Sequence, residues 1–141
     1  MSGWRGKAIA AFFAWFPMVS SGPSQVPTGT RVMSIGLARQ ILTAALKSKG
    51  LNRRPAFDLE YYDGKDPAFY FFEATWDTPR TSVSSGHAGY AVNRVTGDVW
   101  DALACERLTS KAAENLKLRV RKWMNIGPVQ YKEAESHSPC P

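Results

Sequence analysis

The sequence predicts an α+β fold in which a helix precedes a four-stranded antiparallel sheet and a C-terminal helix packs on one sheet face. Three features support this prediction. Apolar residues between 35 and 46 recur with helical spacing, the period changes to two from Phe57 onward, and helical spacing returns between 113 and 124. Because the strands follow one another without an intervening helix, we expect them to pair as successive antiparallel neighbours.

The first helix is predicted to begin after Ser34, whose side chain is a suitable N-cap, and to end before Gly50, which suits the left-handed position after a helix. Lys47 lies in the last turn, where the helix dipole favours a cation. The apolar positions form one stripe, so one face of the helix should be buried. The stripe comprises Ile35, Ala38, Ile41, Leu42, Ala45 and Leu46.

The sheet is predicted from alternating apolar and polar residues separated by turn residues. The four predicted strands are 57–62, 69–76, 88–95 and 98–103. The last two form a hairpin through Thr96-Gly97-Asp98, in which Gly97 supplies the positive φ of a tight turn. Tyr90 and Trp100 are predicted to pack this hairpin against the helices. Glu73 shares a parity with Phe69 and Phe71, so we expect it to need a partner such as Arg94.

The last helix is predicted to begin around Thr109 or Ser110 and to end at Gly127-Pro128. Its expected buried stripe is Ala113, Leu116, Val120, Trp123 and Met124, with Lys117 elsewhere on the surface. Residues 34–127 then make a single α+β domain. Residues 128–141 are expected to be a loose tail unless Cys140 is tied to the domain.

The N-terminal residues 1–21 are typical of a secretory signal peptide. Arg5 and Lys7 precede the apolar run Ala8–Val19, which is too short to span a bilayer. The alternative is a buried or partner-binding N-terminal helix. Residues 22–33, rich in Pro, Gly, Ser and Thr, are expected to be a flexible leader. Cleavage would leave no stable membrane span, so we expect a periplasmic or secreted protein.

The distribution of charge bears on nucleic-acid binding, and the two cysteines bear on disulfide formation. The net charge of +6 is spread along the chain without a basic run that alternates with aromatics, which argues against nucleic acid. Cys105 and Cys140 are the two cysteines. In an oxidising compartment they could form a disulfide, and the alternative is a buried Cys105 with a free thiol in the tail.

Residues for catalysis are scarce. His87 and His137 lie at no metal-ligand spacing from each other or from a cysteine, and no glycine-rich loop has the context of a phosphate site. We therefore predict no catalytic residues, no metal site and no cofactor, and expect a protein that is not an enzyme.

A polar loop, 77–86, joins two predicted strands and could present side chains to a protein partner. We predict that partner binding involves Trp76, Asp77, Arg80 and His87. The alternative is a cone-shaped α+β domain that binds or converts a small ligand in an aromatic pocket. That pocket would be lined by Tyr70, Phe72, Glu73 and Trp76.

The hairpin Gly89-Tyr90-Ala91-Val92-Asn93-Arg94-Val95-Thr96-Gly97-Asp98-Val99-Trp100 resembles that of PepSY-like domains and of small nuclear-transport-factor-like immunity proteins from bacterial toxin systems. The resemblance implies a small exported domain that binds and restrains another protein. It favours a periplasmic immunity protein or inhibitor whose partner is a secreted bacterial effector. A further alternative is an envelope protein held by an uncleaved N-terminal segment.

Overall fold

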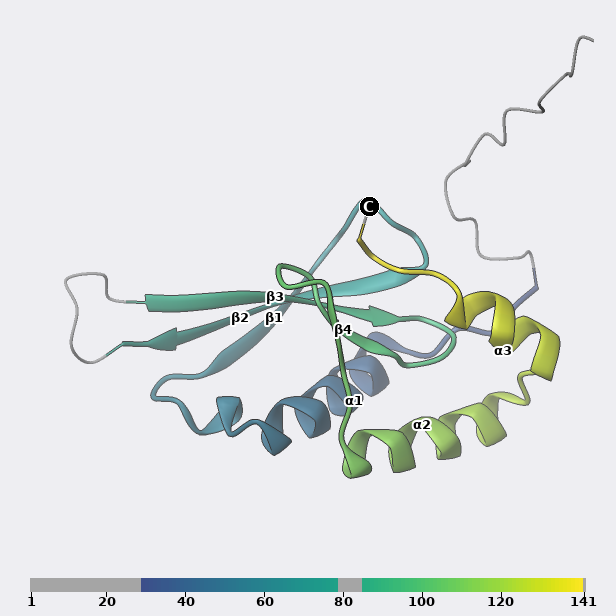
Figure 1. The fold of residues 1–141 in the computed structure, drawn as a ribbon, viewed down its shortest axis with the longest axis horizontal. Helices are drawn as coiled ribbons and strands as arrows, with labels where there is room; N and C mark the ends of the chain where they lie inside the picture. The colour runs from purple at the N-terminus through teal and green to yellow at the C-terminus, as the bar shows by residue number, and fades with distance from the viewer. Residues whose placement is uncertain (1–28, 79–84, 141) are drawn as a thin grey trace, which may run out of the picture.

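A computed structural model describes residues 29–78 and 85–140, so Arg80 and residues 1–28 lie outside the described chain. The elements run, in order, α1 (Ile35–Ser48), η1 (Leu51–Arg53), β1 (Asp58–Tyr62), β2 (Phe69–Asp77), β3 (Ser85–Asn93), β4 (Val99–Asp101), β5 (Glu106–Leu108), α2 (Lys111–Met124) and α3 (Pro128–Glu135). Helices α1 and α2 lie on one side of the sheet (Figure 1). None of the helices in the described part of the chain is both long and apolar enough to cross a bilayer.

The strands form one antiparallel sheet in the order β1-β2-β3-β4-β5, which confirms the α+β fold with sequential antiparallel pairing. The sheet has five strands, so the predicted count of four is wrong. The segment predicted as one strand, 98–103, pairs only over Val99–Asp101. The chain then reverses through residues 102–105 and returns as β5.

The reversal has a local cause. The carboxylate of Asp101 accepts hydrogen bonds from the backbone N–H groups of Leu103 (3.0 Å) and Ala104 (2.9 Å), a turn that aspartate commonly initiates. Cys105 follows with a φ of 58°, in the left-handed region. The apolar Ala102-Leu103-Ala104 run therefore forms a turn although its composition suggested a strand.

The main core lies between α1, α2 and the inner face of the sheet. Ser34 caps α1 by accepting a hydrogen bond from Leu37 N, and Gly50 has a φ of 69° just after the helix, as predicted. The core side chains include Ile41, Leu42 and Leu46 from α1 and Tyr70, Phe72, Tyr90 and Val92 from the sheet. The Tyr70 hydroxyl donates a hydrogen bond to Met33 O at 2.7 Å, which holds the segment before α1 on the core.

Helix α2 begins after Ser110, whose side chain accepts a hydrogen bond from Ala113 N, as predicted. Its buried residues are Ala113, Lys117, Val120 and Met124. Two predictions about this helix are therefore wrong, because Lys117 is buried and Trp123 is 74% exposed. Positions 113, 117, 120 and 124 have the spacing of one helix face, and Lys117 lies on it because a buried carboxylate is its partner.

The C-terminal residues form helix α3 where a loose tail was expected. Ala134 is buried, and its carbonyl oxygen accepts a hydrogen bond from Asn93 Nδ2 at 2.9 Å. Cys140 is joined to Cys105 by a disulfide. In Figure 1 the C-terminal end lies on the opposite side of the sheet from α1 and α2. These attachments order the segment although its sequence is polar.

The hairpin between β3 and β4 carries a buried polar centre. Asn93 Oδ1 accepts hydrogen bonds from Val95 N and Thr96 N at 2.9 and 3.0 Å, which shapes the turn. Gly97 has a φ of 75°, as expected, and a Cβ there would lie 3.0 Å from Ile41 Cδ1 and 3.1 Å from Lys117 Cγ. The turn therefore requires glycine both for its backbone conformation and for its packing.

Asp98 is the acidic centre of this turn and is only 2% exposed. Its Oδ1 lies 2.5 Å from Lys117 Nζ and is also paired with the Arg107 guanidinium. Burial alone would raise the pKa of Asp98, but the hydrogen bonds from Arg107 and Lys117 outweigh it and hold that pKa below its ordinary value. One carboxylate thus ties the hairpin to β5 and to α2.

Candidate functional site

The face of the sheet that turns away from α1 and α2, called the outer face below, has a packed half and an open half. In the packed half, Phe69 and Ala91 are buried together, with Phe71 and Trp100 partly buried against them. Trp100 therefore packs on the outer face and not against the helices as predicted, whereas Tyr90 lies in the main core. The open half has no such cover.

The open half contains a groove lined by Tyr62, Glu73, His87, Gly89 and Leu103. The residues come from β1, β2, β3 and the turn after β4. Gly89 pairs with Glu73 across the sheet, and a Cβ placed on Gly89 would meet only Ala102 Cβ at 3.8 Å and the Tyr62 hydroxyl at 4.0 Å. The absence of a side chain at Gly89 thus leaves the groove open, although the fold would accommodate one there.

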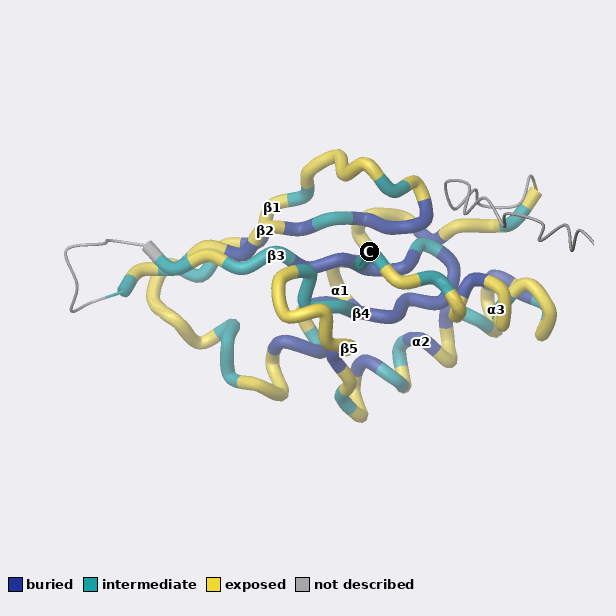
Figure 2. Tube along the Cα trace, turned by 45° about the horizontal axis from the view of Figure 1, so that its top comes forward, coloured by how far each residue is buried: buried dark blue, intermediate teal, exposed yellow. Residues whose placement is uncertain are grey.

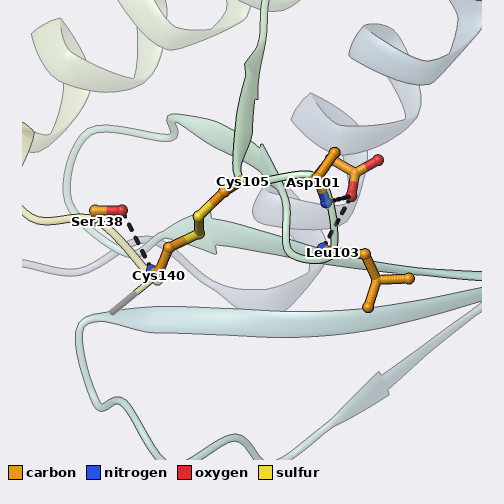
Figure 3. The surroundings of a disulfide bond; sticks show 6 residues. Asp101, Leu103, Cys105, Ser138 and Cys140 are labelled. Atoms are coloured by element: carbon orange, nitrogen blue, oxygen red, sulfur yellow. Dashed lines mark hydrogen bonds between the residues drawn. A yellow bond between two sulfur atoms is a disulfide. The ribbon is translucent and has the colours of Figure 1, made fainter.

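Leu103 stands at the edge of this groove and is 75% exposed. Two interactions restrain the turn that carries Leu103 (Figure 3). The Asp101 carboxylate accepts a hydrogen bond from the Leu103 backbone N–H, and the turn ends at the Cys105–Cys140 disulfide. Figure 2 shows this turn as exposed. An apolar side chain held outward on a constrained turn is a pre-organised contact for another molecule.

Carboxylates are concentrated beside the groove. Glu60 and Glu73 are directly opposite each other in the β1–β2 register, an arrangement of like charges that destabilises a sheet. Asp58 and Asp77 are exposed on the same two strands. Because side chains alternate along a strand, both lie on the same face of the sheet as Glu60 and Glu73. Within residues 29–78 and 85–140, none of these four carboxylates forms an ion pair with a basic side chain. No basic side chain in the described part of the chain therefore compensates their charge.

The side chain of Trp76, the first of the predicted partner-binding residues, lies on the helix side of the sheet. It is half-buried against the main core, and the Arg54 guanidinium lies 4.4 Å from its ring centroid. Its indole also covers Gly86, since a Cβ on Gly86 would lie 2.2 Å from Trp76 Nε1. Trp76 and the groove are therefore on opposite faces.

His87 lines the groove, and Asp77 is exposed at the end of β2, with its backbone N–H donating to Pro55 O at 2.9 Å. Arg80 belongs to the segment that the structure does not describe. The structure therefore brings His87 together with Glu73, which was predicted for a different pocket, and with Tyr62, Gly89 and Leu103, which were not predicted as site residues. The sequence did contain a signal for Leu103. Asp101 lies two residues before it, and aspartate commonly starts a turn, so a turn at Leu103 could have been predicted.

The residues of the predicted aromatic pocket do not line one cavity. Tyr70 and Phe72 are buried in the main core, whereas Glu73 is exposed on the outer face. Arg94, the expected partner of Glu73, instead donates a hydrogen bond to Phe69 O at 3.0 Å and stacks on the Tyr70 ring. The prediction of a Glu73–Arg94 ion pair is wrong. Glu73 lies on the outer face of the sheet, whereas Arg94 lies against Tyr70, a residue of the main core.

The side chains around the groove can make charged, polar and apolar contacts with another molecule. No three His, Cys, Asp or Glu side chains in this part of the chain group so that they could hold a metal ion. Both sulfur atoms are bonded to each other, so neither cysteine is a thiol nucleophile in this form. The groove offers two carboxylate-bearing strands, an imidazole, a phenol and an exposed leucine.

Comparisons with known proteins identify a fold but no family. No protein-family model matches the chain, and no curated protein matches it. A chain in a solved type VI secretion system effector-immunity complex from Pseudomonas protegens has a similar structure, with a TM-score of 0.59 and 20% sequence identity. The alignment covers 76% of this chain and 92% of that chain. These comparisons do not single out PepSY-like or nuclear-transport-factor-like domains.

Proposed function

We propose that this protein is an exported, non-enzymatic immunity protein that binds and neutralises a bacterial effector toxin through the outer-face groove. The observation that carries the proposal is the groove itself: an exposed leucine on a constrained turn beside carboxylates that form no ion pair among the described residues. The structural likeness to a chain of an effector-immunity complex supports the same function.

The charge of the groove indicates the partner's chemistry. The strand pair β1–β2 keeps Glu60 opposite Glu73 at a cost in sheet stability, and a cationic segment of the effector would relieve that repulsion. Leu103 would supply an apolar contact at the edge of the same site. The proposed partner surface is therefore a Lys- or Arg-bearing loop with an apolar neighbour.

Export to the periplasm is part of this proposal. The signal-like N-terminus favours it, and the Cys105–Cys140 disulfide is of the kind that persists in oxidising compartments. Mass spectrometry of the mature N-terminus should detect a chain beginning near Gly22.

The test is a pull-down with the product of the adjacent gene, together with rescue of cells that express that product. Two variants probe the groove. Gly89→Leu adds a side chain at the floor of the groove, where a Cβ would meet no backbone atom within 4 Å, and Glu73→Lys reverses a charge that lines the groove. Each should weaken binding about 100-fold, or ~2.7 kcal/mol, and abolish rescue.

Matched controls separate binding from folding. Gly36→Ala adds a side chain to an open position of α1, and Glu133→Lys reverses an exposed charge on α3. Both should bind and rescue like the wild type. Full binding by Gly89→Leu and Glu73→Lys would reject the groove, and failure of the wild type to bind or rescue would reject the immunity function.

A further inference from the structure

The helical side of the molecule has a charge opposite to that of the outer face. The exposed charged side chains of α1 and α2 are Arg39, Lys47, Lys111, Arg119 and Lys122, all of them cationic. The one acidic residue in the two helices, Glu114, lies 3.0 Å from Lys117 Nζ and is already paired. Among the described residues, none of the five exposed cations has a carboxylate within ion-pair distance.

Exposed apolar side chains lie among these cations. Trp123 is 74% exposed and Leu118 is 63% exposed, although both belong to a helix that buries its opposite face. Trp123 stands between two hollows, one lined by residues of α1 and α2 that include Leu37 and Leu116, and the other by Arg31, Val32 and Met124. The outward surface of α1 and α2, called the helical face below, thus combines unpaired cations with an exposed indole.

We propose that the helical face docks on an anionic phospholipid surface. Lysine and arginine are attracted by the negative potential of such a surface, and tryptophan favours the boundary between headgroups and acyl chains. The helices lie side by side as one layer beneath the sheet, so both can meet a flat surface together (Figure 1). Docked in this way, the molecule presents the outer-face groove away from the lipid.

Vesicle sedimentation of the mature protein, which in the proposed function begins near Gly22 and lacks the apolar run Ala8–Val19, tests the proposal. We expect binding to vesicles that contain phosphatidylglycerol, weak binding to pure phosphatidylcholine, and loss of binding as salt is raised. The double variant Arg119→Gln/Lys122→Gln should bind the anionic vesicles about 25-fold more weakly, since each charge contributes about fivefold. In the wild type, addition of these vesicles should shift the tryptophan emission to shorter wavelength, and Trp123→Phe should lose most of that shift.

The control is Lys65→Gln/Lys132→Gln, which removes the same charge from exposed positions outside the helical face. This control should lose much less affinity for anionic vesicles than Arg119→Gln/Lys122→Gln does. All variants keep the same N-terminal segment. Equal losses in the two double variants, equal binding to neutral and anionic vesicles, or no binding to either would overturn the proposal. So would effector binding that depends on Arg119 and Lys122, because it would assign this face to an acidic protein.

Discussion

Replacing Asp98 with asparagine should lower the free energy of unfolding by about 3 kcal/mol, the scale on which a buried ion pair is broken by removal of one partner. Lys117 is only 6% exposed and would remain charged inside the fold with Glu114 as its one carboxylate neighbour. Arg107 would lose the same partner. Urea denaturation at neutral pH measures the loss.

The pH dependence gives a second readout. Because the folded-state pKa of Asp98 is lowered, the stability it contributes is complete above its unfolded pKa of about 3.9 and is lost as pH falls through the lower folded value. The difference between wild type and Asp98→Asn should therefore shrink in acid. The double variant Asp98→Asn/Lys117→Met should recover part of the stability, because it removes the stranded ammonium. If Asp98→Asn were as stable as the wild type, the ion pairs of Asp98 with Lys117 and Arg107 would not be needed for stability.

Removing the disulfide should have the next largest effect. The bond joins residues separated by 35 positions, for which the entropy of loop closure gives up to about 4 kcal/mol. Cys105→Ser/Cys140→Ser should lose about 2–4 kcal/mol in thermal or urea unfolding. It should also weaken effector binding, because the Leu103 turn loses one of its two restraints.

A comparison with Leu103→Ala separates these two consequences. That variant should keep the stability of the wild type, since the side chain is largely exposed, yet it should weaken binding. If the disulfide variant were as stable as the wild type, the bond would not constrain the fold. If it bound the effector equally well, the turn would not depend on the bond.

The local features of the fold were predictable from the sequence. The caps Ser34 and Ser110 and the turn at Gly97 depend on neighbouring residues, and the structure contains each of them. The same local reasoning predicted that Lys117 is exposed. It gave more weight to the charge of lysine than to the helical spacing that puts position 117 on the buried face. Only the long-range pairing with Asp98 explains its burial.

The candidate site was less predictable because it combines residues from distant parts of the chain. His87 was selected as a loop residue, but its neighbours Tyr62 and Leu103 come from β1 and from a turn mistaken for a strand. The repulsive pairing of Glu60 with Glu73 becomes visible only once the strand register is known. Helix α3 depends likewise on Asn93 and on the disulfide, both remote in sequence.

The most direct test of the central claim is photo-crosslinking of the complex with the effector. A benzophenone amino acid would replace Tyr62 or Leu103 at the groove, and Gln40 or Trp123 on the helical face, all partly or largely exposed. We predict effector crosslinks from Tyr62 and Leu103 and none from Gln40 or Trp123. Crosslinks from the helical positions, with none from the groove, would contradict the account.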